Sequence, residues 1–578
     1  MSERRIGVYI CHCGGNISDY VDVAAVRDAV ADLPDVVHAE TSLFACSDGT
    51  QQDMIKMIRE QNLDGLVVAS CSPKLHLFTF RGVSRRAGLN PFEYTQANIR
   101  EQCSWAHTDD RDGATLKAIG LVKGAIAKTR ESSALEPMAV QTTPASLVVG
   151  AGIAGLRAAI GLADLGLRVY LLEQSATVGG WVGQFGPTFP NDRDGRAMVA
   201  DLLEQLGSRP TITLLTDAEL TAKSGSFGNY EVTITVHGEP ESTVLATVGS
   251  IIIATGFDTY EPAIGEYGYG IDGVVTLAQF KALVESSPDG LRFADRPVRT
   301  VTYVYCVGNR QPGGNEYCSK FCCSATVHAS LEVAALDPSI HQYHLYRDIR
   351  TYGKYELLYE QSRKRGSVFM KFPDEVPPRV ARTDDGRLAV TTRDTLSGNV
   401  DVTIPTDLVV LVTGMVPRKN TDLTTMLHLP VGDDGFFNEI HPKLRPVETV
   451  VDGVLIAGAS QGPKTVSESV ASALAAVAQS GAMLLNGRAE LNPLVAVAGA
   501  ACAWCGECAA VCPYDAISRV EVDGVAVAHI DPSACKGCGG CAPYCPNEAI
   551  DLLGVTTAQV EHMIDGMVGP VREEVLVS

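Results

Sequence analysis

Two runs of cysteines near the end of the chain share the spacing Cys-x2-Cys-x2-Cys-x3-Cys-Pro. In bacterial proteins this spacing binds two 4Fe–4S clusters, and the fourth cysteine of each run is a ligand of the other cluster. Zinc sites are a poor alternative, because zinc ribbons lack the repeated x2-x2-x3 spacing and the following proline. One cluster is therefore predicted to bind Cys502, Cys505, Cys508 and Cys545, and the other Cys535, Cys538, Cys541 and Cys512.

A glycine-rich turn has the spacing of a dinucleotide site. Gly150, Gly152 and Gly155 form G-x-G-x-x-G between the apolar run 147–149 and a helical stretch. In such turns the first glycine permits the tight turn, the second lets the backbone approach a pyrophosphate, and the third lets the helix lie close to the strand. Glu173 ends the next predicted strand, where an acidic residue holds a ribose hydroxyl. The alternative is a purely structural glycine turn, and the agreement of strand, helix and acid favours the dinucleotide site.

The segments after this turn indicate which dinucleotide is bound. A Gly-Gly-Trp turn, two apolar strands ending in Thr-Gly, and a third strand before a long apolar helix follow in order. This order resembles that of the thioredoxin-reductase-like flavoproteins over residues 144 to 486, and the resemblance implies FAD. The predicted FAD contacts are Gly150, Gly152, Ile153, Ala154, Gly155, Glu173, Gln174, Gly180, Trp181, Thr255, Gly256, Thr413, Gly414, Gly458, Gln461, Gly462 and Lys464.

Two lysines are candidates for contact with the flavin ring. Lys354 lies in the polar and aromatic stretch 347–355, and we predict it to be catalytic, because an ammonium group stabilises a reduced flavin. The alternative is a solvated loop lysine. Lys464 precedes a helix whose N-terminus should face the pyrimidine carbonyl of the ring. Ala459 departs from related flavoproteins, which usually carry Asp at this position.

The chain has cysteines where a second nucleotide-binding half would carry its own glycine fingerprint. A predicted strand at 303–307 leads into 308–314, which lacks the G-x-G-x-x-G spacing. We expect the cysteines here to bind a cluster, because a reducing compartment gives disulfides no role. An NAD(P)H site is therefore not expected in this half, and the flavin would exchange electrons with clusters. The cysteines are Cys306, Cys318, Cys322 and Cys323.

Residues 1–135 are predicted to form a small α/β domain. The predicted strands are 6–10, 36–44, 65–70 and 92–99, and helical patterns include 22–33 and 51–61. Cysteines follow these strands, and the carboxyl ends of parallel strands meet at one edge of a sheet, where ligands bind. The alternative is that these cysteines are small buried apolar residues. The candidate ligands are Cys11, Cys46, Cys71 and Cys103, with Cys13 as a fifth.

The total of 17 cysteines limits the possible ligand sets. Eight in the C-terminal repeat and four in the central group leave five, which is one more than a further 4Fe–4S cluster needs. Cys11 or Cys13 is the expected spare because one residue separates them, and the spacing does not decide which. About four clusters are therefore expected in the chain.

Length and composition indicate a multidomain globular protein. The 578 residues exceed what one core accommodates, and the net charge of −21 argues against binding to nucleic acid or anionic membranes. The sequence shows no signal-peptide core and no run of about 18 apolar residues, which predicts a cytoplasmic protein. We expect an α/β multidomain protein. Its parts are an N-terminal α/β cluster domain (1–135), a flavoprotein core with a cluster insert (144–490), a ferredoxin domain (491–555) and a helical tail (556–578).

Longer motifs resemble the HdrA-like family, which comprises the A-type subunits of heterodisulfide reductase, from residue 4 to about 550. Besides the glycine and cysteine motifs above, they are 11–17, 69–76, 97–105, 317–323, 348–354 and 461–464. This resemblance implies an FAD protein with several 4Fe–4S clusters that splits an electron pair by flavin-based bifurcation. It also implies a homodimer within a larger cytoplasmic complex. The implied partners are the heterodisulfide-reducing HdrB- and HdrC-like subunits, a hydrogenase- or formate-dehydrogenase-linked donor subunit, and ferredoxin.

Two alternative functions fit these residues less well, and a third fits them equally well. A stand-alone NAD(P)H- or ferredoxin-dependent reductase of a disulfide or polysulfide would need a C-x-x-C beside the flavin or a second glycine fingerprint. Neither is present outside the ferredoxin repeat. A related subunit serving another reductase, such as benzoyl-CoA reductase, or serving sulfur oxidation would carry the same motifs. A structural scaffold with vestigial clusters conflicts with the complete ligand sets of the repeat.

Overall fold

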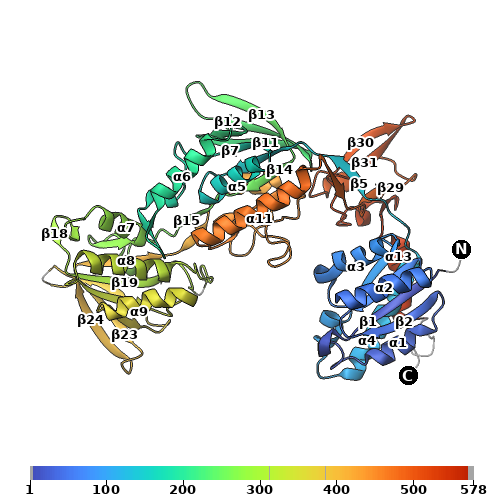
Figure 1. The fold of residues 1–578 in the computed structure, drawn as a ribbon, viewed down its shortest axis with the longest axis horizontal. Coiled ribbons are helices and arrows are strands. Elements are labelled where there is room, and N and C mark those ends of the chain that lie inside the picture. The colour runs from blue at the N-terminus through green and yellow to red at the C-terminus, as the bar shows by residue number, and fades with distance from the viewer. Residues whose placement is uncertain (1–3, 312, 385, 570–578) are drawn as a thin grey trace. The chain divides into compact units, whose positions relative to one another are not determined.

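The computed structural model describes residues 4–311, 313–384 and 386–569 (Figure 1). The chain divides into two compact units, one made of residues 1–139 and 490–578 and the other of residues 140–489. The N-terminal domain and the ferredoxin segment, which are far apart in the sequence, therefore belong to the same unit. Among the described helices, none combines the length and the apolar character needed to cross a membrane.

The N-terminal part of the first unit is a parallel α/β domain. Its elements are β1 (Ile6–Cys11), α1 (Val23–Ala31), β2 (Val36–Ser42), α2 (Asp48–Glu60), β3 (Gly65–Ser70), α3 (Pro73–Ala87), β4 (Tyr94–Asn98) and α4 (Arg111–Arg130). The strand order is β2-β1-β3-β4, and all three pairings are parallel. Every residue of β1 and β3 is buried, as expected for strands covered by helices on both faces. Helix α1 packs with α4 and α2 packs with α3.

The C-terminal part of the first unit contains two antiparallel ribbons, two α-helices and one short 3-10 helix. Its elements are β29 (Ala496–Ala498), α12 (Glu507–Ala510), β30 (Ile517–Val522), β31 (Val525–Ile530), η7 (Ala542–Tyr544), β32 (Ile550–Leu552) and α13 (Thr557–Val568). β29 pairs with β32, and β30 pairs with β31. The tail expected at 556–578 thus contains α13, and residues 570–578 lie outside the described part.

Helix α13 packs along α4, and glycines allow a close approach of the two backbones. A Cβ atom at Gly124 would lie 3.0 Å from the carbonyl oxygen of Met563 and 2.6 Å from the side chain of Met567. A Cβ atom at Gly566 would lie 3.0 Å from the carbonyl oxygen of Lys123. Side chains larger than hydrogen would push the helices apart, so these glycines fix the spacing. The predicted tail is therefore an integral part of the N-terminal domain's packing.

The first half of the second unit is built on a five-stranded parallel sheet. Its main elements are β6 (Ala145–Val149), α5 (Ile153–Asp164), β7 (Arg168–Leu172), α6 (Gly195–Gly207), β10 (Ile212–Leu215), β11 (Ala218–Ser226), β12 (Asn229–Val236), β13 (Ser242–Val248), β14 (Ser250–Ile253), β27 (Val454–Ile456), η6 (Gly458–Gln461) and α11 (Val466–Leu484). The parallel sheet has the order β10-β7-β6-β14-β27, and β11-β12-β13 form an antiparallel sheet. Val149 pairs with Leu172 and Ile253, so β6, β7 and β14 end at the same edge.

The second half of this unit repeats the same plan. Its main elements are β16 (Val274–Thr276), α7 (Leu277–Glu285), β19 (Thr300–Val307), α8 (Cys322–Leu336), β20 (His341–Tyr346), η5 (Gly353–Tyr355), α9 (Glu356–Lys364), β21 (Val368–Lys371), β22 (Arg379–Arg382), β23 (Leu388–Asp394), β24 (Val400–Thr406) and β25 (Leu408–Thr413). The parallel order is β16-β25-β19-β20-β21, and β22-β23-β24 form an antiparallel sheet. The strands β15 (Phe257–Thr259) and β26 (Met415–Pro417) pair where the chain passes between the halves.

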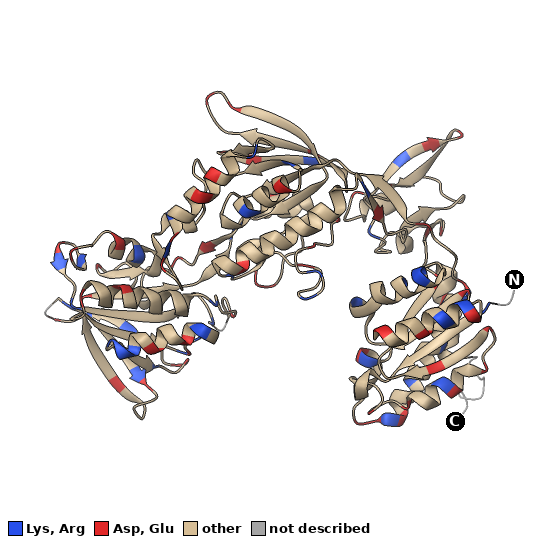
Figure 2. Cartoon of the chain, viewed as in Figure 1, with Lys and Arg blue, Asp and Glu red and all other residues tan. Residues whose placement is uncertain are grey.

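Short elements complete the described chain. They are η1 (Cys13–Gly15), η2 (Arg100–Ser104), β5 (Met138–Gln141), η3 (Val182–Gln184), β8 (Pro187–Thr188), β9 (Arg193–Asp194), η4 (Glu266–Gly268), β17 (Arg292–Phe293), β18 (Arg296–Pro297), α10 (Thr421–Leu427) and β28 (Arg488–Leu491). Acidic and basic residues are interspersed along outer helices such as α2 and α9 (Figure 2), which spreads the net charge of −21 over the chain.

Candidate functional site

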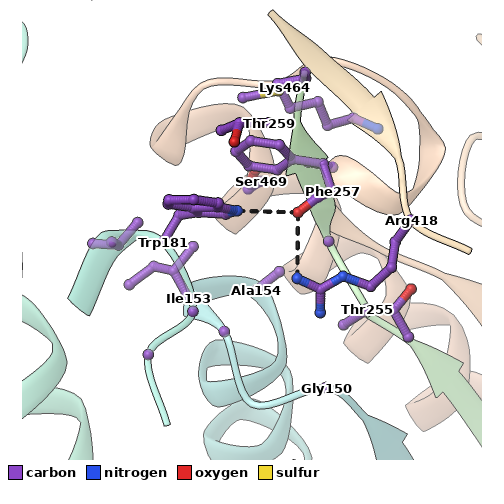
Figure 3. A pocket seen from close by; sticks show the side chains of 18 of the residues that line it. Gly150, Ile153, Ala154, Trp181, Thr255, Phe257, Thr259, Arg418, Lys464 and Ser469 are labelled. Carbon is purple, nitrogen blue, oxygen red and sulfur yellow. Dashed lines mark hydrogen bonds between the residues drawn. The ribbon is translucent and has the colours of Figure 1, made fainter. Parts of the chain in front are cut away.

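A cavity of about 810 Å³ lies at the carboxyl edge of the first parallel sheet (Figure 3). The turn after β6, the end of β7, the segment after β14 and the start of α11 all contribute to its wall. Of the residues predicted to contact FAD, the following line it: Gly150, Gly152, Ile153, Ala154, Glu173, Gln174, Gly180, Trp181, Thr255, Gly256, Thr413 and Lys464.

The glycine turn has the geometry that a pyrophosphate needs. Gly150 has φ +102°, and a Cβ atom there would lie 2.5 Å from the carbonyl oxygen of Ala254. A Cβ atom at Gly155 would lie 1.8 Å from the carbonyl oxygen of Gly150, so this glycine lets α5 approach the strand. Gly152 has open space around the same position and caps α5 without a side-chain hydrogen bond. The free N–H groups of the helix therefore face a space that an anion fits.

Glu173 lies on the cavity wall, and backbone and side-chain groups hold its carboxylate. It accepts hydrogen bonds from the N–H of Ala151 (3.0 Å) and from the N–H (3.1 Å) and Oγ (2.8 Å) of Ser175. These bonds fix the carboxylate beside the glycine turn. Each carboxylate oxygen can accept more than one hydrogen bond, so capacity for a ribose hydroxyl remains.

One buried hydroxyl group on the cavity wall lacks a hydrogen-bond partner among the described residues. Thr255 Oγ1 is buried and makes no hydrogen bond within the described residues, and buried polar groups in native structures are normally paired. Nearby, the carbonyl of Phe257 accepts bonds from Trp181 Nε1 (3.1 Å) and from Arg418 Nη2 (3.4 Å) (Figure 3). The glycine cradle and the unpaired hydroxyl both fit FAD.

Of the two lysines predicted to contact the flavin ring, Lys464 lines the cavity. Its Nζ donates to the carbonyl of Gly458 (3.1 Å) and to Oε1 of Gln461 (2.8 Å). Burial lowers the pKa of Lys464 to about 8, although Glu439 and Glu468 oppose the shift. A charge at this position is therefore costly until an anionic group binds nearby.

Five predicted contacts do not line the cavity: Gly155, Gly414, Gly458, Gln461 and Gly462. Two of these glycines pack against neighbouring residues instead. A Cβ atom at Gly414 would overlap Asn309, which comes from the segment after β19, and a Cβ atom at Gly458 would lie 2.7 Å from Cβ of Ala154. Oε1 of Gln461 accepts hydrogen bonds from Nζ of Lys464 and from Oγ of Ser472. Ala459, the departure noted in the sequence, does line the cavity.

Lys354 is exposed in η5 and is not among the residues that line the cavity. The nearest link is indirect: the ring of the neighbouring Tyr355 lies edge-on to Phe189, a wall residue, with centroids 5.7 Å apart. The geometry therefore favours Lys464 over Lys354 for a role beside the ring, and the role of Lys354 stays a prediction.

Sequence reasoning missed the wall that the second half contributes. Lys281 of α7 and Phe321, Ala325 and His328 of α8 and its N-cap line the cavity, as does Arg418 after β26. Their spacing at 321, 325 and 328 is helical, which places these three on one face of α8. The sequence gives no sign of which half that face meets, because the answer depends on how the halves pack.

The central cysteines form a buried group beside α8. Cys306, Cys322 and Cys323 are each at most 4% exposed. Burial, Cys323 and Cys318 raise the pKa of Cys306 to about 11, although Arg310 and Arg347 oppose the shift. The pKa of Cys323 is lowered, chiefly by a hydrogen bond from Cys322 and then by the N–H of Arg350. All four thiols thus lie within electrostatic reach of one another, with arginines around them.

In the N-terminal domain the structure gathers four of the five cysteines. Burial raises the pKa of Cys11, and Cys13 and Cys46 raise it further. Burial also raises the pKa of Cys71 to about 11, with Cys13 and Cys11 among its neighbours. Sγ of Cys11 accepts bonds from the N–H of Cys13 (3.2 Å) and of Ala45 (3.3 Å).

Cys103 differs from these four. It is fully buried, and burial raises its pKa to about 11, while Lys117 is the charged neighbour that lowers it. No cysteine acts on the thiol of Cys103 among the described residues. The choice of spare cysteine stays a prediction: the spacing pointed to Cys11 or Cys13, and the groups that shift the pKa of Cys103 make it a further candidate.

The C-terminal cysteines lie in two groups. A small hollow is lined by Cys502, Cys505, Cys508 and Cys545. Burial raises the pKa of Cys541 to about 11, and Cys535, Cys538 and Cys512 raise it further. In both groups the last cysteine of one run lies with the first three of the other run. Backbone N–H groups donate to four of the sulfurs at 3.2 to 3.4 Å: Ala528 to Cys502, Ala549 to Cys545, Ala516 to Cys512 and Ala496 to Cys535.

All 17 cysteines are free thiols. Over the part of the chain that the structure describes, no three His, Cys, Asp or Glu side chains converge closely enough for a single metal ion. Metal binding deprotonates cysteine thiols, because the cation supplies the charge that burial otherwise lacks.

A two-half dinucleotide fold with a glycine cradle, joined to a repeated cysteine module, defines an iron–sulfur flavoprotein. Residues 145–299 match the family model of pyridine nucleotide-disulphide oxidoreductases, and residues 501–549 match that of the 4Fe-4S dicluster domain. Relatives that match about nine tenths of the chain identify the family within this class. The chain belongs to the HdrA family of oxidoreductases, the A-type subunits of CoB--CoM heterodisulfide reductase.

Three relatives show how much of the chain the likeness covers. The second iron-sulfur A-type subunit of CoB--CoM heterodisulfide reductase from Methanopyrus kandleri is 36% identical over 91% of this chain and 92% of its own length. The corresponding protein of Methanocaldococcus jannaschii is 34% identical over 91% and 93%, respectively. The A-type subunit of the H(2):CoB-CoM heterodisulfide,ferredoxin reductase from Methanothermobacter thermautotrophicus is 34% identical over 90% and 91%.

Among solved structures, thioredoxin reductase of T. acidophilum aligns with a TM-score of 0.41 and 14% identity, over 59% of this chain and 99% of that one. The fold assignment rests on the strand orders and the family models rather than on this alignment.

Proposed function

We propose that this chain is the electron-branching subunit of a heterodisulfide reductase-like complex. In this role it exchanges electron pairs with a two-electron donor at a bound FAD and passes single electrons through 4Fe–4S clusters. The electrons reach ferredoxin on one branch and a disulfide-reducing partner on the other. When bound, FAD accepts electrons in pairs and releases them singly, while each cluster carries one electron at a time.

One observation carries this proposal: the start of α8 belongs both to the cavity and to the central cysteine group. Phe321 and Ala325 line the cavity, and Cys322 and Cys323 lie between them in the sequence. One helical turn therefore separates the cavity wall from the thiols. A cluster held there would be the nearest electron carrier to a flavin in the cavity.

The chain's own residues set the environment at both ends of this step. Arg310 and Arg347 lie near the thiol of Cys306, where positive charge favours electron-rich sulfur. The helix N-terminus at Cys322 adds to the same field. On the flavin side, Thr255 Oγ1 and the N–H groups after Gly152 would position the cofactor. The cavity's apolar and aromatic wall would exclude water.

The proposed ligand sets follow the groups described above and give about four clusters. The N-terminal cluster would use Cys11, Cys13, Cys46 and Cys71, with Cys103 left as a buried thiol. The central cluster would use the four cysteines at 306–323, and the two C-terminal clusters would use the crossed sets of the repeat.

We propose partners of the class that relatives' names state. The Methanothermobacter protein is named for H2, the CoB-CoM heterodisulfide and ferredoxin, and a Methanococcus maripaludis relative adds formate. This chain would accordingly work in the cytoplasm with HdrB- and HdrC-like subunits, a hydrogenase- or formate-dehydrogenase-linked donor and ferredoxin. It would act as a homodimer within that complex.

The experiment is an anaerobic reductive titration of the full chain. Reduced ferredoxin is added in small portions, while flavin absorbance and the paramagnetic signals of reduced clusters are recorded together. We expect flavin bleaching and cluster reduction to proceed together, since both lie on one path. The proposal is wrong if NADPH bleaches the flavin directly and the clusters remain oxidised.

A further inference from the structure

Three charged side chains and one histidine form a chain from the cavity wall to the protein surface. Lys281 and His328 line the cavity on the side that the second half contributes. Nζ of Lys281 donates to Glu332 (2.6 Å) and to the carbonyl of Pro187 (3.1 Å). Oδ1 of Asp192 accepts a hydrogen bond from Nε2 of His328 (2.7 Å), and Nδ1 of the same ring lies 3.9 Å from Glu332.

Three of these side chains are largely shielded from solvent, and the fourth is exposed. His328 is 6% exposed, Lys281 13% and Glu332 17%, whereas Asp192 on the loop between β8 and β9 is 76% exposed. Charged groups are costly to bury, and a buried ion pair adds little net stability. A buried charged chain with one end in water and the other at a cofactor cavity is therefore better explained by a function than by stability.

We propose that Lys281, Glu332, His328 and Asp192 carry protons between the flavin cavity and solvent. The proposal rests on the proposed function. A two-electron donor delivers a hydride equivalent, which is one proton and two electrons. The clusters take only the electrons, one at a time, so the proton must leave by another route.

The imidazole of His328 is suited to this step, because it can accept a proton at one ring nitrogen and release one from the other. In the forward direction the proton passes from the Lys281–Glu332 end to His328 and leaves from Asp192 to water. The two electrons leave through the cysteine-bound clusters, so charge and mass balance. In the reverse direction the same groups deliver the proton.

Other charged groups on the cavity wall have different partners. Arg418 Nε donates to Asp258 (3.1 Å), and Lys464 donates to Gln461 (2.8 Å). The groups that face His328 from the elements packed around it are Lys281 of α7, Glu332 of α8 itself and Asp192. The remaining charged residues of the wall are Glu173, Glu219, Lys419 and Asp422.

The test follows proton release directly. The full chain, purified without oxygen with its FAD and clusters, is reduced and mixed rapidly with ferricyanide, which accepts only electrons. Flavin absorbance and the colour of a pH-indicator dye are recorded together. We expect His328→Ala to slow proton release and flavin reoxidation at least about tenfold, as loss of a general base does. Added imidazole should restore the rate, which a purely structural role would not predict.

Two further variants keep the test decisive. Asp192→Asn, on an exposed loop, should slow proton release to a smaller degree, and it decides the matter if His328→Ala does not fold. Glu285→Gln is the matched control: Glu285 of α7 pairs with Arg196 (3.0 Å) in a similar contact but does not line the cavity. It should release protons at the wild-type rate.

The outcomes separate this inference from the proposed function. The relay is wrong if the protein holds FAD and clusters, yet His328→Ala and Asp192→Asn release protons as fast as wild type. The proposed function itself fails if the wild-type chain binds no FAD, or if its clusters stay unchanged while the flavin is oxidised.

Discussion

The two halves of the second unit share a plan but differ at one turn. In the first half, β6 leads through residues 150–152 into α5, and Gly152 faces open space. In the second half, β19 leads through 308–321 into α8, and a Cβ atom at Gly308 would lie 2.1 Å from the ring of Tyr260. An aromatic ring therefore packs against the first residue of the second turn, whereas the N-cap glycine of the first turn has open space around its Cβ position.

The first residues of the helices that follow these two turns, α5 and α8, also differ. Helix α5 begins with Ile153, Ala154 and Gly155 after the N-cap Gly152, and no side chain among the described residues caps its first N–H groups, which suits a pyrophosphate. Helix α8 begins with Cys322 and Cys323, two thiols of the central group. A strand–turn–helix unit can thus keep its fold while its turn changes from a nucleotide cradle to a candidate cluster site. Fold alone does not determine the ligand.

The largest expected effect comes from closing the first turn. Gly155→Ala would place a methyl group 1.8 Å from the carbonyl oxygen of Gly150, which forces α5 away from β6. We expect a loss of about 3 kcal/mol or more in the free energy of unfolding. FAD should then be missing from the purified chain. Flavin content per chain and the thermal unfolding midpoint measure both effects.

A glycine elsewhere provides the control. Gly207, the last residue of α6, has open space at the Cβ position, so Gly207→Ala should change stability by less than about 1 kcal/mol and keep its FAD. Equal flavin content in the two variants would show that the turn does not form the cradle.

A smaller effect is expected at Lys464, on the wall of the flavin cavity, in the pH dependence of stability. The pKa of Lys464 is about 8 in the folded chain and 10.5 ordinarily, so between these values the unfolded state binds more protons. The free energy of unfolding therefore rises with pH across this window. Relative to Lys464→Met, flavin-free wild type should gain at most about 3 kcal/mol between pH 8 and 10.5.

Chemical unfolding of the flavin-free proteins at both ends of the window measures this difference. Lys354→Met removes an exposed lysine and should follow the wild-type pH dependence. If Lys464→Met also follows it, the ammonium of Lys464 is not buried as the structure places it.

Local patterns in the sequence were enough to predict much of this architecture. The parallel strands, the glycine turn and the repeated cysteines depend on neighbours in the chain, and the α/β flavoprotein fold with its dicluster domain was predicted correctly. Residues 136–143, which lie between the first two predicted domains, contain the strand β5, for which the sequence shows no signal. Residue spacing shows where turns fall but not whether a partner strand is available.

Features that depend on packing were missed. The helix α13 looked like a tail because its contact with α4 joins residues about 440 positions apart. Cys103 follows a strand end like the other cysteines, and residue spacing does not show that its side chain is fully buried. Lys281 and His328 reach the cavity only because the two halves meet there. The spacing of residues in the sequence does not reveal contacts between distant segments.

The most direct test of the account is the iron and FAD content of two matched serine variants, purified without oxygen. Cys306 and Cys103 are both buried, and both have a pKa raised to about 11. We expect about sixteen irons and one FAD in wild type and in Cys103→Ser, but about four irons fewer, with FAD retained, in Cys306→Ser. If Cys306→Ser kept the wild-type iron content, the second half would hold no cluster, and the central claim would be contradicted.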